Sequence, residues 1–202
     1  MDGLRPACLY SVGCAMGEVT GVDKVFLNFL KNSDEPEKQA QVRDILTRLK
    51  QFSSYGLLSG SMGSQDVFSE EVVRAYWLGD GRSSLILTHN YQVLKEIETM
   101  RKEKKLPARA VNRLLGCLVS FGEIIEVNSD KLLVLHHSLS YSNRFYVWRN
   151  KKQGVKIGFV ANPKPGDLVS IHYSIARELI TRSQARLLGE NTRKALFGVL
   201  GS

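Results

Sequence analysis

The stretch CLVSFGEIIEVNSDKLLVLHH, residues 117–137, contains two apolar runs separated by a short polar sequence. The first run includes Ile124 and Ile125, and the second is KLLVLHH. Runs rich in Val, Ile and Leu that are interrupted by turn-forming residues, here NSD at 128–130, are typical of two paired strands. We therefore predict a β-hairpin over this stretch.

Further short apolar runs follow the hairpin. They are FYVWR at 145–149, VKIGFV at 155–160 and LVSIH at 168–172, with the turn-forming sequence PKPGD at 163–167 before the last. About five short strands this close in sequence favour a small closed or partly closed barrel of the OB kind, because closure leaves few exposed strand edges.

The end of the chain shows a helical pattern. Thr181 and Gln184 have the spacing of a capping box, in which each side chain bonds the backbone N–H of the other residue. Ala185, Leu188 and Ala195 then recur at helical spacing. We predict a C-terminal helix after the barrel.

The first half of the chain has helical spacing instead of strand alternation. We predict helices over 22–30, over 36–52 after Asp34, over 70–79 after Ser69 as N-cap, and over 91–105. The segment with Gly56, Gly60 and Gly63 is expected to be a loop, and 101–107 a helix end and linker. The predicted class is α+β, with a helical domain over 1–110 and a small β-barrel with a C-terminal helix over 111–202.

Composition excludes several classes of protein. The chain has 202 residues, of which 43% are hydrophobic, enough to build a core, so a disordered or collagen-like chain is excluded. No stretch approaches the roughly 20 uncharged apolar residues of a membrane-spanning helix, and residues 1–17 lack the apolar run of a signal peptide. Three cysteines, far apart, do not resemble a disulfide scaffold. We predict a cytoplasmic protein.

The net charge of +8 is concentrated in the second half. Residues 111–202 carry 13 Lys+Arg against 6 Asp+Glu, a net +7, whereas residues 1–110 carry 15 against 14, a net +1. A basic module of this kind can bind RNA, an acidic protein surface or an anionic ligand, and charge alone does not distinguish these partners.

Two short motifs in the second half resemble a known family. Cys117 and Gly122 lie in CLVSFGEIIEV, and Gly166, Asp167 and His172 lie in GDLVSIHYSIARELI. Their order and spacing over roughly 117–197 resemble the HypC/HupF family of small [NiFe]-hydrogenase maturation chaperones. The chain departs from that family in two respects: the family's cysteine follows the initiator Met, whereas Cys117 is internal, and Phe121 replaces the family's Pro.

The resemblance implies a HypC-like barrel that presents Cys117 and His172 to an iron ion. In that family the iron, which carries diatomic ligands, passes from a maturation scaffold protein to the hydrogenase large subunit. We therefore expect Cys117 and His172 to be metal-binding residues, with iron as a transient cofactor. The whole chain also resembles an uncharacterised bacterial family with segments like VVRAYWLGD at 72–80 and HNYQVL at 89–94.

The remaining candidate residues have simpler interpretations. His136 and His137 are adjacent on a strand and point to opposite faces, so at most one serves a given site. His89, before a helix, is expected to be a cap or a surface residue. Cys8 and Cys14 lack a second pair of ligands for a structural zinc. No acid/base dyad or nucleophile signature is apparent, and we expect no enzyme.

The sequence supports two hypotheses about function, which belong to different classes of protein. The first is a hydrogenase-associated maturation chaperone or accessory protein that docks on the large subunit and handles its iron through Cys117. The alternative is a single-stranded nucleic-acid binding module, most simply for RNA, that uses the basic and aromatic residues Arg144, Tyr146, Trp148 and Arg149.

Overall fold

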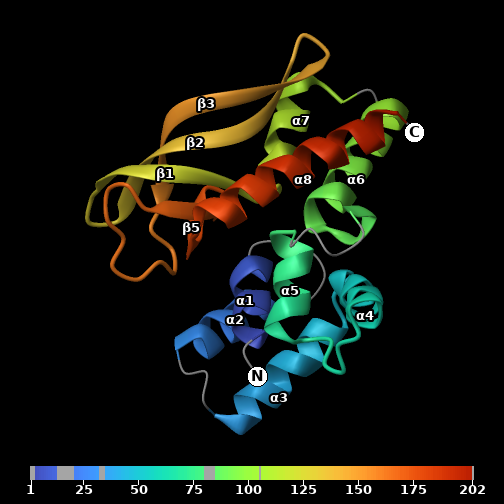
Figure 1. The fold of residues 1–202 in the computed structure, drawn as a ribbon, viewed down its shortest axis with the longest axis vertical. Helices are drawn as coiled ribbons and strands as arrows, with labels where there is room; N and C mark the ends of the chain where they lie inside the picture. The colour runs from blue at the N-terminus through green and yellow to red at the C-terminus, as the bar shows by residue number, and fades with distance from the viewer. Residues whose placement is uncertain (1–2, 13–20, 32–34, 80–84, 105, 202) are drawn as a thin grey trace. The chain divides into compact units, whose positions relative to one another are not determined.

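The computed structural model describes residues 3–12, 21–31, 35–79, 85–104 and 106–201; Cys14 and Asp34 lie outside these ranges. The predicted α+β class is confirmed, because helices precede a closed five-stranded barrel and a C-terminal helix (Figure 1). The chain divides into two compact units, Met1–Thr88 and His89–Ser202. Among the described residues, no helix combines the length and hydropathy needed to cross a bilayer.

The first unit is helical. Its elements are α1 (Leu4–Ser11), α2 (Val22–Lys31), α3 (Pro36–Thr47), α4 (Gln51–Met62), α5 (Glu70–Trp77) and the 3-10 helix η2 (Leu85–Leu87). The predicted start of α5 is confirmed, since the Ser69 side chain accepts a hydrogen bond from the backbone N–H of Val72. Gly79, with a φ of 73°, follows the end of this helix.

The expectation of a loop around Gly56 and Gly60 is wrong, because both glycines lie within α4. Tyr55 and Leu58 of this helix are fully buried. Burying two such side chains contributes more than the roughly 1 kcal/mol that each glycine costs in a helix. Gly63 ends α4 in the left-handed conformation, with a φ of 67°.

The second unit begins and ends with helices. α6 (His89–Lys104) and α7 (Ala108–Leu115) precede the barrel, and α8 (Arg182–Leu200) follows it beside α6. The division of the chain places α6 with the barrel, whereas the sequence pattern places it with the first domain. No helix was predicted over the residues of α7; its Val111 and Leu115, four residues apart, are both buried and give it a core-facing stripe.

The strands of the barrel are β1 (Ser120–Val127), β2 (Lys131–Ser142), β3 (Phe145–Lys156), β4 (Leu168–His172) and β5 (Ile175–Ile180), in the closed order β1-β2-β3-β5-β4. The predicted hairpin is confirmed by antiparallel pairing of β1 and β2. The two runs expected at 145–149 and 155–160 are not separate strands, because 150–154 continue the ladder with β2 and join most of them in β3. The predicted capping box of α8 is present, with Thr181 and Gln184 each bonding the other's backbone N–H.

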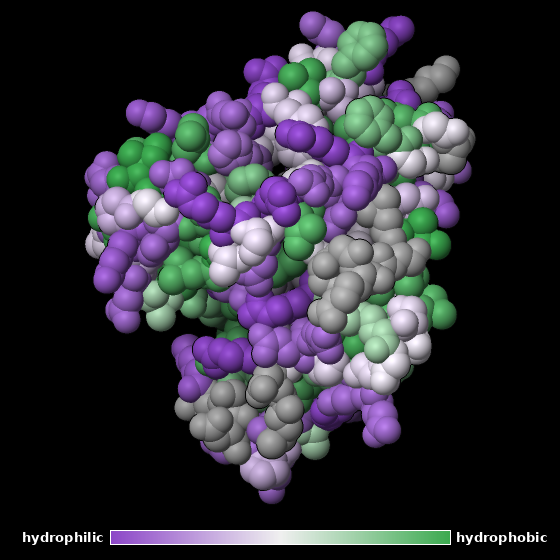
Figure 2. Space-filling model, in the orientation of Figure 1, coloured by the Kyte–Doolittle hydropathy of each residue, from purple (hydrophilic) through white to green (hydrophobic). Residues whose placement is uncertain are grey.

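Apolar side chains fill the barrel. Its core consists of Ile124, Leu132, Val134, Val155, Val160, Val169, Ile171 and Ala176. On the face of the molecule in Figure 2, hydrophilic side chains, in purple, cover much of the second unit, as its sequence charge predicts.

The β2–β3 hairpin has two different faces. Its twelve paired positions run from Ser142↔Phe145 to Lys131↔Lys156. Since side chains alternate along a strand, the face that carries Val134 and Val155 into the barrel core continues toward the turn with polar residues. These are His136, Ser138 and Ser140 of β2 and Arg149, Lys151 and Gln153 of β3, and beyond them Val147 and Phe145 of β3 lie next to the turn. The hairpin therefore extends the barrel interior as a polar surface.

Candidate metal centre

Three potential metal ligands from separate segments of the second unit lie together. His89 is the first residue of α6, Cys117 lies in the turn between α7 and β1, and His172 ends β4. One ligand atom from each residue, an imidazole nitrogen or the thiol sulfur, lies within 4.8 Å of the other two. We call these residues the His-Cys-His cluster. It contains both residues that the sequence predicts as metal-binding, and it adds His89.

Backbone hydrogen bonds hold the segments of the cluster in place. The backbone N–H of Tyr173 donates to the carbonyl of Gly116 at 3.0 Å, which joins the end of β4 to the turn that carries Cys117. The Asn90 side chain accepts from the N–H of Val119 and donates to its carbonyl, both at 2.8 Å. These contacts position each ligand next to a fixed backbone segment.

His89 contacts both the backbone and the side chain of Cys117. Its Nε2 lies 2.9 Å from the Cys117 carbonyl oxygen and 3.9 Å from the Cys117 sulfur. The His89 ring is also nearly perpendicular to that of His172, with ring centroids 5.4 Å apart. His89 is only 5% exposed, so its expected role as a surface residue is wrong, although it does begin a helix. A single sequence cannot indicate this contact, because 28 residues separate His89 from Cys117.

His172 is completely buried, and its environment keeps it neutral. Burial lowers the pKa of His172 to about 4, because the charged imidazolium would lose its hydration; a hydrogen bond with Cys117 acts in the opposite direction and is weaker. A neutral imidazole keeps a lone pair, which is the form that binds metal ions. The side chain of His172 is therefore in its ligand form at neutral pH.

The donor set fits a transition metal ion. Two imidazoles and one thiolate match the ligands of Zn²⁺ and of the neighbouring first-row metals, and three protein ligands leave a fourth position for a further molecule. Tetrahedral bonds of about 2.0 and 2.3 Å separate a nitrogen from a sulfur by roughly 3.6 Å. The 3.9 Å between His89 and Cys117 thus needs only a small adjustment. Cys117 is half-buried whereas both histidines are buried, so Cys117 is the most accessible residue of the cluster.

Other candidate residues lie elsewhere. Cys8 is buried in α1, and burial raises the pKa of its thiol, which makes it a poor ligand. His136 and His137 lie on opposite faces of β2, as predicted: His136 bonds Ser120 and Gln153, and His137 stacks on the ring of Phe121.

The four residues predicted to bind nucleic acid do not share one face. The Tyr146 hydroxyl donates to a carboxylate oxygen of Glu98 in α6, and the Arg193 guanidinium of α8 lies 5.5 Å from the Trp148 ring centroid. Arg149 is on the opposite face of β3, and Arg144 is in the β2–β3 turn with a φ of 67°. The aromatic rings of this set contact helices, and Arg149 points away from them.

Comparison with known proteins gives a family but no activity. Residues 88–199 match the model of a family described as a family of unknown function, DUF6390. This match covers more than half of the chain and includes the whole cluster. No curated protein and no solved structure matches the chain. An uncharacterised family was expected over the whole chain; the match to one covers residues 88–199 and does not include the segment at 72–80. The resemblance to HypC/HupF chaperones gains no support from these comparisons.

Proposed function

Because the chain belongs to DUF6390, whose function is unknown, we propose its function from the site itself: the second unit is an accessory module that binds one transition metal ion through His89, Cys117 and His172. The observation that carries this proposal is the convergence of three ligand atoms within 4.8 Å from segments far apart in sequence. At this site the module holds an ion and passes it on.

The half-buried position of Cys117 supports transfer of the ion rather than permanent storage. A structural zinc site is enclosed by four protein ligands, whereas this cluster supplies three and leaves one side accessible at Cys117. A partner protein can approach that side and supply the fourth ligand. The net +7 of residues 111–202 favours a partner with an acidic surface.

A more specific form of the proposal names the metal ion and the partner protein. The juxtaposition of Cys117 and His172 is what the motif resemblance to hydrogenase maturation chaperones implies. In this form the ion is iron, it is bound transiently in the cytoplasm, and the partner is a [NiFe]-hydrogenase large subunit or its maturation scaffold protein.

Metal binding is tested with the full-length protein after removal of metal by a chelator. Titration with Co²⁺ is expected to give one ion per chain, with the intense absorption of a thiolate–cobalt bond. Cys117→Ser should abolish that absorption, and His172→Gln, which leaves the thiolate and one imidazole, should weaken the binding of Co²⁺. His137→Gln is the matched control, because His137 lies outside the cluster and should leave binding unchanged. Unchanged cobalt spectra in folded Cys117→Ser would overturn the proposal.

The partner is tested separately by copurification from the native host. The finer proposal predicts recovery of a hydrogenase large subunit and an infrared band of diatomic ligands on the purified protein, both lost in Cys117→Ala. Metal binding without either signal would retain the ion-binding function and reject the hydrogenase partner.

A further inference from the structure

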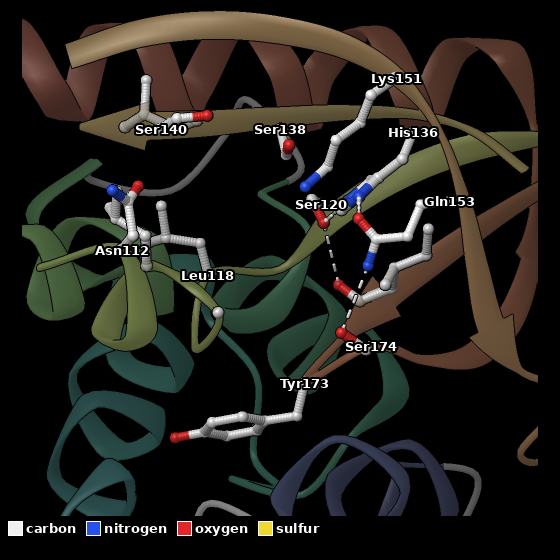
Figure 3. Close-up of a pocket in the computed structure, with 14 residues that line it drawn as sticks. Asn112, Leu118, Ser120, His136, Ser138, Ser140, Lys151, Gln153, Tyr173 and Ser174 are labelled. Carbon is white, nitrogen blue, oxygen red and sulfur yellow. Dashed lines mark hydrogen bonds between the residues drawn. The ribbon is translucent and has the colours of Figure 1, made fainter. Parts of the chain in front are cut away.

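A serine, a histidine and a glutamine of the second unit form a hydrogen-bonded chain that the metal proposal does not use. The Oγ of Ser120 lies 2.7 Å from Nε2 of His136, and the other ring nitrogen, Nδ1, lies 3.1 Å from Oε1 of Gln153. The three side chains come from β1, β2 and β3 and point toward one another (Figure 3). Sequence spacing does not indicate them, because 16 and 17 residues separate the successive partners.

The hydrogen bonds fix the direction in which a proton can move. Since Oε1 of Gln153 is an acceptor, Nδ1 of His136 carries the hydrogen and Nε2 presents its lone pair. The Ser120 hydroxyl therefore donates to Nε2, and its 3.3 Å contact with the Ile171 carbonyl is the longer alternative. His136 is 7% exposed, and burial lowers the pKa of its ring, so the imidazole is neutral and Nε2 keeps its lone pair.

The hydrogen-bonded side chains of Ser120, His136 and Gln153 line a cavity. The cavity has a volume of about 280 Å³, and its wall includes all three side chains together with Ser138, Ser140 and Lys151. Lys151 is exposed and is the cross-strand partner of His136, so its ammonium group adds positive charge to the cavity. The space suits a small polar molecule with a negative charge.

We propose that Ser120 is a nucleophile activated by His136, and that the cavity takes a small carboxylic ester bearing an anionic group. A hydroxyl donating to a neutral imidazole, which is itself oriented by a third group, is the arrangement that activates serine for attack on a carbonyl carbon. Gln153 is a positioning residue, because it acts by fixing the orientation and tautomer of His136. Lys151 holds the anionic group of the ester.

The reaction balances as an ester hydrolysis. Ser120 Oγ attacks the carbonyl carbon while its proton passes to Nε2 of His136. The bond from that carbon to the alkoxy oxygen breaks, and the alcohol leaves with the proton from His136. A water molecule then attacks the acyl-serine and gives a proton to His136, which returns it to Oγ of Ser120 as the carboxylic acid is released.

A fluorophosphonate probe tests the nucleophile directly in the full-length protein. In labelling, the bond between Ser120 Oγ and phosphorus forms, the phosphorus–fluorine bond breaks, and the proton passes to His136. Peptide mass spectrometry should locate the label on Ser120 and not on Ser138 or Ser140, which line the same cavity. This comparison needs no substitution. Labelling of Ser120 no faster than that of Ser138 would overturn the proposal.

Variants test the other two groups. His136→Gln should lower the labelling rate of Ser120 by about 100-fold or more, the usual contribution of a general base. Gln153→Leu, which lacks an acceptor oxygen, should also lower the labelling rate of Ser120. Gln153→Glu retains an acceptor oxygen and should label at the rate of the unmodified protein. Labelling that is unchanged in folded His136→Gln contradicts the proposal. Cys117→Ser should leave labelling intact, so this result is independent of metal binding.

Discussion

The sulfur of Cys117 lies 3.9 Å from Nε2 of His89, and the carbonyl oxygen of the same cysteine lies 2.9 Å from that nitrogen. Without a metal ion, the nitrogen can donate a hydrogen bond to the carbonyl. To bind a metal ion through Nε2, His89 must exchange this bond, worth about 1 kcal/mol, for a metal bond. The backbone contact thus holds His89 close to its ligand position.

If His89 is a ligand, its removal weakens metal binding without abolishing it. We expect His89→Ala to lower the affinity for Zn²⁺ by at least about tenfold, because Cys117 and His172 still provide two ligands. Competition with a chromophoric chelator measures this change. An affinity equal to that of the unmodified protein would limit the site to Cys117 and His172.

The metal-free protein should lose stability in mild acid. The pKa of His172 is about 4 in the folded state and about 6.5 in an unfolded chain, so the unfolded state binds more protons between these values. Stability is therefore complete above about pH 6.5 and falls by about 3 kcal/mol toward pH 4. The lowered pKa of His136 acts in the same direction.

Urea unfolding at pH 7 and pH 5 measures this effect. His172→Met, which has no titrating group, should show a smaller difference between the two pH values than the unmodified protein. An equal difference in both would show that other groups cause the acid sensitivity.

Asn90 should be a major stabilising residue of the second unit. Its side chain bonds both backbone groups of Val119 and donates to Thr192 of α8 at 2.8 Å, and all these groups are buried. Asn90→Leu keeps the side-chain size but leaves the two Val119 backbone groups without this partner, at a cost of about 1–3 kcal/mol for each, whereas the Thr192 hydroxyl still donates to the carbonyl of Leu188. We expect a total loss of about 2–6 kcal/mol in the free energy of unfolding.

Asn112 provides a matched control for this prediction. It bonds the backbone N–H and carbonyl of Tyr141 in the same way, but its own side chain is exposed. Water can replace it, so Asn112→Leu should cost less than about 1 kcal/mol. Equal costs at both positions would mean that burial does not determine the contribution.

Tyr146 should stabilise the fold through Glu98 rather than bind nucleic acid. Burial raises the pKa of Glu98, but hydrogen bonds from Arg101 and Tyr146 outweigh it, so the net shift is downward. Tyr146→Phe removes one donor to this carboxylate and should cost about 1.5–3 kcal/mol. Filter binding of single-stranded RNA should show no change of affinity in this variant. Reduced RNA affinity in a fully stable Tyr146→Phe protein would instead favour the nucleic-acid alternative.

Local sequence patterns predicted those parts of the fold that depend on neighbouring residues. The β1–β2 hairpin and the capping box of α8 are of this kind, because turn residues and cap spacing act over a few positions. α4 was not predicted, because its glycines disfavour a helix and only burial of Tyr55 and Leu58 compensates for them.

The candidate sites also contain some residues that local sequence patterns indicate and others that they do not. Motif resemblance indicated Cys117 and His172, but no local pattern connects either of them with His89. Ser120, His136 and Gln153 were not predicted as a group, since their contacts depend on the register between three strands. Register over such distances is a property of the folded barrel and not of any one segment.

The parallel contact between β3 and β5, at Lys156 and Ile175, has a consequence for biosynthesis. Sequential hairpins such as β1–β2–β3 can form as the chain leaves the ribosome, whereas this contact must wait for the synthesis of β4 and β5. His172 belongs to that late portion, so a nascent chain lacks the complete ligand set. If the cluster binds an ion as proposed, its capture distinguishes finished molecules from unfinished ones.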